Sequence, residues 1–320
     1  MSIKVRFVDF WNGFNIYSNI ITDILTRRGD IEIIENGEPD LLIYSCFGNK
    51  HFEFNNCTKL YCSGENDVPN FNFCDYAISY HYLEFSNRHL RLPLFNLQKA
   101  RMLAAERSKA DIDSHLESFI QRKFCSIVVS NSLYADPIRD RFWNLLNQYK
   151  EIASGGGYKN NVGEPVKDKL EFIKGYKFNI AFENSMVSGY TTEKIIEPCI
   201  VNTVPIYWGN RLVAKDFNPE AFIDISDFDS LDRAVDYVIK VDNDPELYTS
   251  YLKANLLNRY PYLDYEEIIN NFINNIIDNG MPVFRTKYGR VGIFLKEIEN
   301  ENIEEPISNN IFKKIFKKFI

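Results

Sequence analysis

Residues 176–209 read YKFNIAFENSMVSGYTTEKIIEPCIVNTVPIYWG, and this stretch decides the fold class. Apolar residues alternate along 178–182, which indicates a buried strand. A second buried strand is expected at 204–208. Between the two strands, the threonines at 191–192 predict the cap of a helix that opens with Glu193. The stretch therefore predicts a β-α-β unit with polar side chains after its first strand. In open α/β sheets that edge is where ligands bind.

Composition limits the classes of protein that the chain can represent. Its 320 residues allow two ordinary domains, and 45% hydrophobic residues are enough for packed cores. The net charge of −7 does not suggest a nucleic-acid partner. The six cysteines lack CxxC spacing, so we expect reduced thiols. The chain opens on an alternating strand without a signal-peptide block, and no run of about 18 apolar residues predicts a membrane span.

Strands and helices alternate in two consecutive series. The first series comprises strands at 3–9, 41–45, 59–62 and 76–79, with a helix at 16–28. A stretch without Gly or Pro at 99–123 predicts a helical passage. The second series comprises strands at 125–130, 178–182, 204–208 and 222–225, with helices from Pro137 and at 231–241, 245–257 and 265–277. We therefore expect an α/β protein with two Rossmann-like domains face to face, at 1–122 and 123–300, followed by a basic amphipathic C-terminal helix at 301–320.

Three short patterns could carry chemistry. Glu193-Lys194 lies at the expected helix start, where backbone N–H groups favour an anion; a capping acid beside a solvated lysine is the plainer alternative. Arg139 lies in the first turn of a helix, where a cation opposes the helix dipole unless it faces a ligand anion. Glu65 follows a strand within Ser-Gly-Glu-Asn, and it could be a general base or an ordinary loop acid.

Other motifs argue against a dinucleotide fingerprint and against a metal site. The glycine run around Gly156 lacks the third glycine of GxGxxG, so we expect a flexible loop that could let a ligand approach the backbone. The four histidines lack ligand-like spacing. The Asp-x-Asp triplets at 227–229 and 242–244 precede expected helices, where we favour a capping role over Mg²⁺ binding.

Several of these positions fall together in one pattern. The segments Phe182-Glu183-Asn184-Ser185, Gly189-Tyr190, Thr192-Glu193-Lys194 and Val204–Gly209 resemble the donor-site motif of the α1,3-fucosyltransferases, in particular the bacterial, Helicobacter-type branch. The resemblance extends from about residue 60 to 257. It implies a GT-B-type architecture of two Rossmann-like domains and inverting transfer of L-fucose from GDP-fucose to a sugar hydroxyl.

The resemblance also implies roles for individual residues. Glu65 is similar to the catalytic base, and Glu193 to the carboxylate beside the fucose ring. Arg139 and Lys194 are similar to the cations that bind the diphosphate. Asn184, Tyr190, Glu183 and Gly156 are implied to line the donor pocket. No cofactor and no metal ligand are implied, and stimulation by Mn²⁺ or Mg²⁺ is left open.

The implied acceptor is the 3-hydroxyl of GlcNAc or Glc in N-acetyllactosamine- or lactose-type glycans, as in Lewis-type or lipopolysaccharide O-antigen structures. The alternatives are a related GT-B enzyme that uses another sugar nucleotide, or a non-catalytic glycan- or nucleotide-binding protein. In the tail at 311–320, apolar and lysine residues occupy opposite helical faces. This pattern favours peripheral binding to an anionic membrane over docking on the protein, and hence a cytoplasmic enzyme at the inner membrane.

Overall fold

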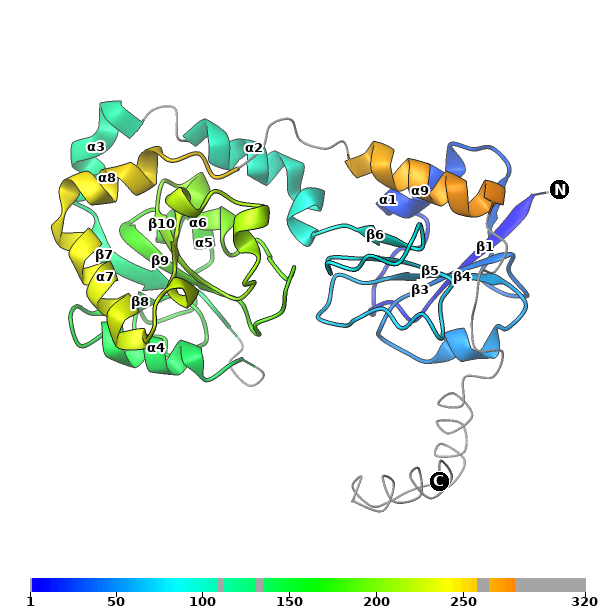
Figure 1. Cartoon of the computed structure of the whole chain (residues 1–320), viewed down its shortest axis with the longest axis horizontal. Coiled ribbons are helices and arrows are strands. Elements are labelled where there is room, and N and C mark those ends of the chain that lie inside the picture. The colour runs from blue at the N-terminus through cyan, green and yellow to red at the C-terminus, as the bar shows by residue number, and fades with distance from the viewer. Residues whose placement is uncertain (1, 109–111, 131–134, 258–264, 280–320) are drawn as a thin grey trace, which may run out of the picture. The chain divides into compact units, whose positions relative to one another are not determined.

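The computed structural model describes residues 2–108, 112–130, 135–257 and 265–279 (Figure 1). Contacts divide the chain into two compact units. Among the described residues, the first holds those up to Cys62, Pro69–Ala77 and those from Ile273 to Asn279, and the second holds Ser63–Val68 and those from Ile78 to Phe272. The Glu65 loop therefore groups with the second unit, although it directly follows a strand of the first. The predicted domain boundaries stay a prediction. Contacts assign Ser63–Val68 and the chain from Ile78 to the second unit, whereas the strand order keeps β4, β5 and β6 in one sheet with the strands of the first unit.

The first sheet has six strands in the order β2-β1-β3-β4-β5-β6. The neighbours β1 and β2, β1 and β3, and β3 and β4 pair in parallel. β3 and β4 are buried along their whole length, as expected for strands of a parallel sheet that is covered on both faces. The strands are β1 (Ile3–Val8), β2 (Ile31–Ile33), β3 (Leu41–Tyr44), β4 (Thr58–Cys62), β5 (Tyr76–Ser79) and β6 (His89–Arg91).

The second sheet has five strands in the order β11-β10-β9-β7-β8, and every neighbouring pair is parallel. The register places Val204 beside Phe178 and Trp208 beside Phe182, so β9 and β10 end together. The strands are β7 (Lys123–Ile127), β8 (Ile152–Ser154), β9 (Tyr176–Phe182), β10 (Val204–Trp208) and β11 (Ile223–Asp224). Two parallel sheets with helical connections confirm the α/β class. The face-to-face arrangement stays a prediction.

Helices cover both faces of the second sheet (Figure 1). Alternate residues of β10 show this: Val204, Ile206 and Trp208 belong to one apolar core, whereas Tyr207 belongs to another. α4 packs on α7 and α3 on α8 beside the first core, while α2 packs on α6 beside the second. These helices are α2 (Lys99–Ser108), α3 (Ile112–Ile120), α4 (Ile138–Leu146), α6 (Ile196–Ile200), α7 (Leu231–Asn243) and α8 (Pro245–Lys253). The other α-helices in the described part of the chain are α1 (Ile20–Thr26), α5 (Lys169–Ile173) and α9 (Tyr265–Asn279).

Some expected elements differ from the structure. The passage at 99–123 holds two helices, α2 and α3, and β7 already begins at Lys123. α1 begins later than expected because the side chain of Asn19 accepts the first N–H groups of the helix. Pro137 occupies the N-cap of α4, and the Asp136 side chain accepts from the Ile138 N–H. The predicted C-terminal helix at 301–320 lies outside the described residues.

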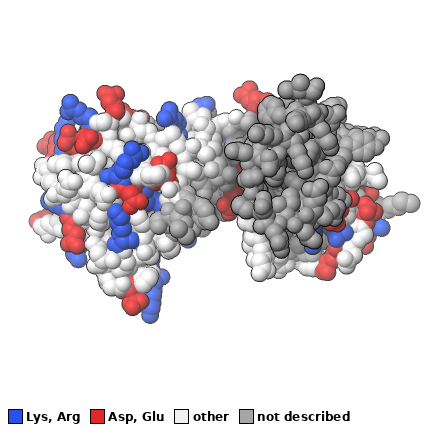
Figure 2. Space-filling model, turned by 90° about the horizontal axis from the view of Figure 1, so that it is seen from below, with Lys and Arg blue, Asp and Glu red and all other residues white. Residues whose placement is uncertain are grey.

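Two sequence expectations concern the surface and the thiols. All six cysteines lie in the described chain and form no disulfide, and five of them are buried. No described helix has both the length and the apolar character that crossing a membrane requires. On the face of the second unit seen in Figure 2, acidic and basic side chains are interspersed. The described residues there form no extended basic surface.

Candidate active site

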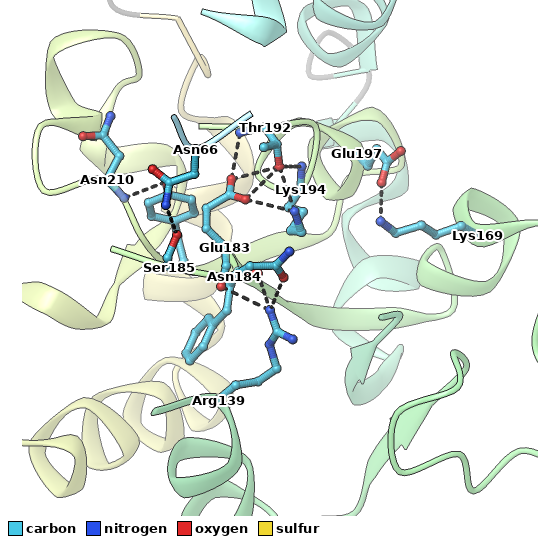
Figure 3. A network of polar contacts seen from close by, with 12 residues as sticks. Asn66, Arg139, Lys169, Glu183, Asn184, Ser185, Thr192, Lys194, Glu197 and Asn210 are labelled. Atoms are coloured by element: carbon cyan, nitrogen blue, oxygen red, sulfur yellow. Dashed lines mark hydrogen bonds and ion pairs between the residues drawn. The ribbon is translucent and has the colours of Figure 1, made fainter. Parts of the chain in front are cut away.

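A buried ion pair lies at the carboxyl end of β9. Glu183 continues β9, since its N–H donates to the Trp208 carbonyl at 2.9 Å. Its carboxylate has a side-chain exposure of 0% and accepts from the Lys194 ammonium at 2.9 Å. The Thr192 N–H and hydroxyl also donate to it, at 2.7 and 2.8 Å (Figure 3). Glu183 thus ties the chain after β9 to the segment that precedes α6.

Burial and charge oppose each other in this pair. Burial raises the pKa of Glu183, while Lys194 and the Thr192 donors limit that rise. Burial disfavours the charge on Lys194, but the carboxylates of Glu183 and Glu193 outweigh it and raise the pKa of the lysine above its ordinary value. Lys194 is therefore a firmly charged cation, and 17% of its side chain is exposed. A partly exposed cation of this kind can also meet an anionic ligand.

A second cation is buried on the other side of the β9 end. Arg139 lies on α4 and is 2% exposed. Its Nη2 donates to the carbonyls of Phe182 and Glu183 at 3.3 and 3.1 Å, and to the Asn184 Oδ1 at 3.0 Å (Figure 3). Burial lowers the pKa of Arg139 from its ordinary value. The guanidinium holds the exposed Asn184 side chain in place and brings a positive charge to the strand end.

The predicted helix start at Glu193 was wrong. α6 begins at Ile196, and Glu193 lies in the turn before it, with its carbonyl accepting from Ile196 and Glu197. The cause is that the N–H and hydroxyl of Thr192 are used by Glu183 instead of capping a helix. The half-buried Glu193 carboxylate instead acts on Lys194 through its charge.

Asn210 fixes the loop between β9 and α6, and sequence reasoning missed it. Its Oδ1 accepts from the Gly189 N–H at 2.7 Å, and its Nδ2 donates to the Thr191 hydroxyl at 3.0 Å. The neighbouring Tyr190 is buried, and its ring centroid lies 5.1 Å from that of Tyr80. Asn210 directly follows the quoted motif, which is the signal that could have identified it.

The structure brings the Glu65 loop to the donor motif. Glu65 is exposed, and its N–H donates to the Ser63 hydroxyl at 3.0 Å. The next residue, Asn66, donates from Nδ2 to the Ser185 hydroxyl at 2.8 Å and accepts from the Tyr80 hydroxyl at 2.8 Å. Figure 3 shows Asn66 reaching Ser185 beside Glu183. Asn66 and Ser185 belonged to the quoted motifs without an assigned role, whereas no pattern pointed to Tyr80.

The loop around Gly156 packs tightly against the chain that follows β7. A Cβ at Gly156 would lie 2.0 Å from the Val129 carbonyl oxygen. That carbonyl accepts from the Tyr158 N–H at 3.0 Å, and the Asn160 side chain donates to the Gly156 carbonyl at 2.8 Å. Glycine is required here by the approach of two chain segments. Its role beside a ligand stays a prediction.

The aspartate triplets have structural roles that differ in part from those expected. Asp244 caps α8, as predicted, by accepting from the Glu246 and Leu247 N–H groups. Asp242 instead pairs with Lys177 at 2.6 Å. α7 is capped by Ser230 rather than by Asp229. Within the described ranges, no group of three or more His, Cys, Asp or Glu residues is arranged to hold a metal ion.

Parallel α/β sheets, with two cations and an exposed amide at the carboxyl end of β9, suit a protein that binds a nucleotide-linked substrate. Two family models match the chain: the α1,3-fucosyltransferase FucT N-terminal domain over residues 5–98 and the C-terminal region of glycosyltransferase family 10 (fucosyltransferase) over residues 120–259. The chain therefore belongs to the α1,3-fucosyltransferase family.

Similarity to individual proteins supports the same family. The chain is 32% identical to the α1,3-fucosyltransferase FucT of Helicobacter pylori over 87% of its own length and 66% of that protein. It is 31% identical to a putative fucosyltransferase of Acanthamoeba polyphaga mimivirus over 51% of its length and 28% of that protein. It thus spans less than two thirds of these relatives. A crystal structure of an α1,3-fucosyltransferase with GDP-fucose superposes with a TM-score of 0.73 at 30% identity, covering 88% of this chain and 91% of that one.

Proposed function

We propose that the chain transfers L-fucose from GDP-fucose to the 3-hydroxyl of GlcNAc or Glc in N-acetyllactosamine- or lactose-type acceptors, with inversion at the anomeric carbon. The observation that carries the proposal is the group of Arg139, Asn184 and Lys194 at the carboxyl end of β9. It occurs in a chain that superposes on a family member crystallised with GDP-fucose. Two cations at a parallel-sheet edge suit a nucleoside diphosphate.

The proposed residues divide the reaction between them. The Glu65 carboxylate takes the proton from the acceptor hydroxyl while that oxygen bonds to C1 of fucose. The bond from C1 to the diphosphate oxygen breaks, and its electron pair leaves with GDP. Arg139 and Lys194 stabilise the negative charge that develops on the leaving diphosphate. Glu193 stabilises the positive charge on the fucose ring, while Tyr190 and Glu183 shape the pocket.

A screen of sugar nucleotides tests the donor. The purified chain is incubated with N-acetyllactosamine and, in turn, GDP-fucose, GDP-mannose and UDP-galactose, and the released nucleotide is measured. We expect release from GDP-fucose alone, dependent on the acceptor. Release from another donor would favour the related GT-B enzyme instead. Nucleotide binding without release from any donor would favour the non-catalytic binding protein.

We also propose that the tail at 301–320 holds the protein on the cytoplasmic face of an anionic membrane. The support is its sequence pattern, with four lysines opposite apolar residues at 311–320. Co-sedimentation with phosphatidylglycerol vesicles compares the full chain with a chain that ends at residue 310. We expect only the full chain to sediment at low salt. Equal sedimentation of the two chains, or none by the full chain, would contradict the proposal.

A further inference from the structure

Aromatic side chains gather where β1 and β3 end in the first unit. The rings of Phe10 and Phe14 stack with centroids 4.0 Å apart, and Trp11 lies 4.9 Å from Phe14 at an interplanar angle of 73°. Phe47, which follows β3, lies 6.0 Å from Trp11. Trp11 remains 51% exposed and Phe47 48% exposed. Large rings left half in water as a cluster mark a binding surface more often than scattered apolar residues do.

The two loops that carry these rings are locked together by Asp9. Asp9 has φ +60°, a left-handed conformation that costs free energy for a residue other than glycine. Its carboxylate accepts from the Lys50 and His51 N–H groups at 3.0 and 2.9 Å and pairs with the His51 Nδ1 at 2.7 Å. Its carbonyl accepts from the Phe47 N–H at 2.9 Å. The rings therefore stand on a fixed base.

The second loop also fits this base closely. A Cβ at Gly48 would lie 2.4 Å from the Asp9 Oδ1, so only glycine lets the chain after Phe47 approach that carboxylate. Asp9 anchors the buried His51, and the rings of Trp11 and Phe47 on the same two loops stay about half exposed. Backbone strain directly beside exposed rings is typical of a pre-organised ligand surface.

The chemistry of this surface favours a sugar. The C–H face of a pyranose packs on aromatic rings, and exposed amides such as that of Asn12 suit its hydroxyl groups. The surface of two exposed rings is far smaller than the roughly 800 Å² that each partner of a stable protein interface buries. The location of the rings also agrees with a ligand surface, since ligands bind at the carboxyl ends of parallel strands. β1, β3 and β4 are parallel neighbours whose carboxyl ends share one sheet edge. The chain that leaves β4 at that edge continues directly to Glu65.

We propose that Trp11 and Phe47 form an aromatic platform that binds a pyranose of the acceptor glycan other than the residue that receives fucose. This inference rests on the proposed function for its assignment to the acceptor. Phe47 follows β3, directly beside β4, and Trp11 follows β1, two strands and about 10 Å from β4, so the platform extends along the sheet edge away from the end of β4. The enzyme then prefers acceptors longer than a disaccharide.

A binding experiment tests the platform without catalysis. The chain has three tryptophans, of which Trp208 is buried and Trp143 is partly buried. A change in tryptophan emission caused by a ligand at the surface therefore comes mainly from Trp11. A tetrasaccharide that ends in N-acetyllactosamine is titrated while tryptophan emission is recorded. We expect a saturable blue shift, which is absent in Trp11→Phe and weakened in Phe47→Ala. A blue shift that persists in Trp11→Phe, or no shift in the parent protein, would overturn the platform.

Kinetics separate failure of the platform from failure of the proposed function. In Trp11→Ala and Phe47→Ala we expect KM for the tetrasaccharide to rise about 3- to 10-fold, with little change for the disaccharide or for GDP binding. Phe85→Ala, which removes a ring that is 45% exposed elsewhere, serves as the matched control. Normal KM values in both platform variants would refute the platform while transfer itself stands. Glycan binding without any transfer would refute the proposed function and leave the platform.

Discussion

Replacing Lys194 by methionine removes the cation from Glu183 while keeping an unbranched side chain of similar length. The Glu183 carboxylate is fully buried in the parent protein and would keep only the Thr192 donors. Removing one partner of a buried pair costs about 3–5 kcal/mol. The remaining donors and the 17% exposure of Lys194 place the expected loss at the lower end, about 3 kcal/mol. Urea denaturation at pH 7.5 measures it.

The same variant should show a characteristic pH dependence. Burial already raises the pKa of Glu183, and replacing Lys194 removes the charge that limits that rise most. A carboxyl group whose pKa is higher in the folded state than in the unfolded state stabilises the fold when protonated. This contribution is complete below the unfolded pKa and is lost as the pH rises through the folded pKa. The deficit of Lys194→Met should therefore shrink from pH 7.5 to pH 5.5, by up to about 1.4 kcal/mol per pH unit.

Two further variants complete this test. Glu183→Gln combined with Lys194→Met should recover most of the loss, because it removes the unpaired buried charge. Lys174→Met breaks an exposed pair with Glu171, whose side chains are 56% and 71% exposed, and should change stability by less than about 0.5 kcal/mol. A loss below about 1 kcal/mol in Lys194→Met, or a deficit that does not depend on pH, would show that Lys194 does not neutralise a buried Glu183 charge.

The remaining predictions concern four other features. Asn66→Leu should lower turnover about tenfold and leave GDP binding unchanged. In a double-mutant cycle with Ser185→Ala, the effects of the two substitutions on turnover should not be additive, because the two residues share a hydrogen bond. Additive effects would contradict this coupling. Burial raises the pKa of Asp224 to about 6, so its contribution to stability is lost as the pH rises through that value. Asp224→Asn should then be more stable than the parent at pH 8, by up to about 3 kcal/mol, with no gain at pH 4, as urea denaturation checks. Gly156→Ala should lower stability by about 2 kcal/mol or more, because its Cβ meets the Val129 carbonyl, and an unchanged Tm would show that the loop can yield. EDTA should leave substantial transferase activity, and complete loss that Mn²⁺ or Mg²⁺ restores would return the aspartate triplets to consideration.

The sequence predicted the parts of the fold whose burial pattern is strong and local. β9 and β10 are buried along their whole length, and their apolar runs were found with nearly correct bounds. Three-residue strands such as β2 and β8 carry too few positions for a pattern and were not predicted. α6 was placed three residues early because Thr192 resembled a helix cap, whereas it serves a buried carboxylate.

The residues of the candidate site could be predicted from the sequence, but the contacts between them could not. Arg139 and Lys194 were named from their positions, yet the sequence did not indicate that Lys194 would pair with Glu183. The bond between Asn66 and Ser185 joins residues 119 positions apart, and no periodicity records such a pairing. Tertiary packing alone brings the two loops together. The inference from sequence therefore ends at the identity of the groups, and the structure supplies their partners.

The most direct test of the account is the product of transfer to N-acetyllactosamine from GDP-fucose, with its linkage determined by NMR for the parent and for Glu65→Gln. We predict an α-linked fucose on the 3-hydroxyl of GlcNAc. Turnover should fall by about 100-fold or more in Glu65→Gln while GDP binding is kept, because the amide cannot accept the proton. Glu171→Gln, at an exposed acid far along the chain, should match the parent. A product with another linkage, no fucosylated product, or normal turnover in Glu65→Gln would contradict the account.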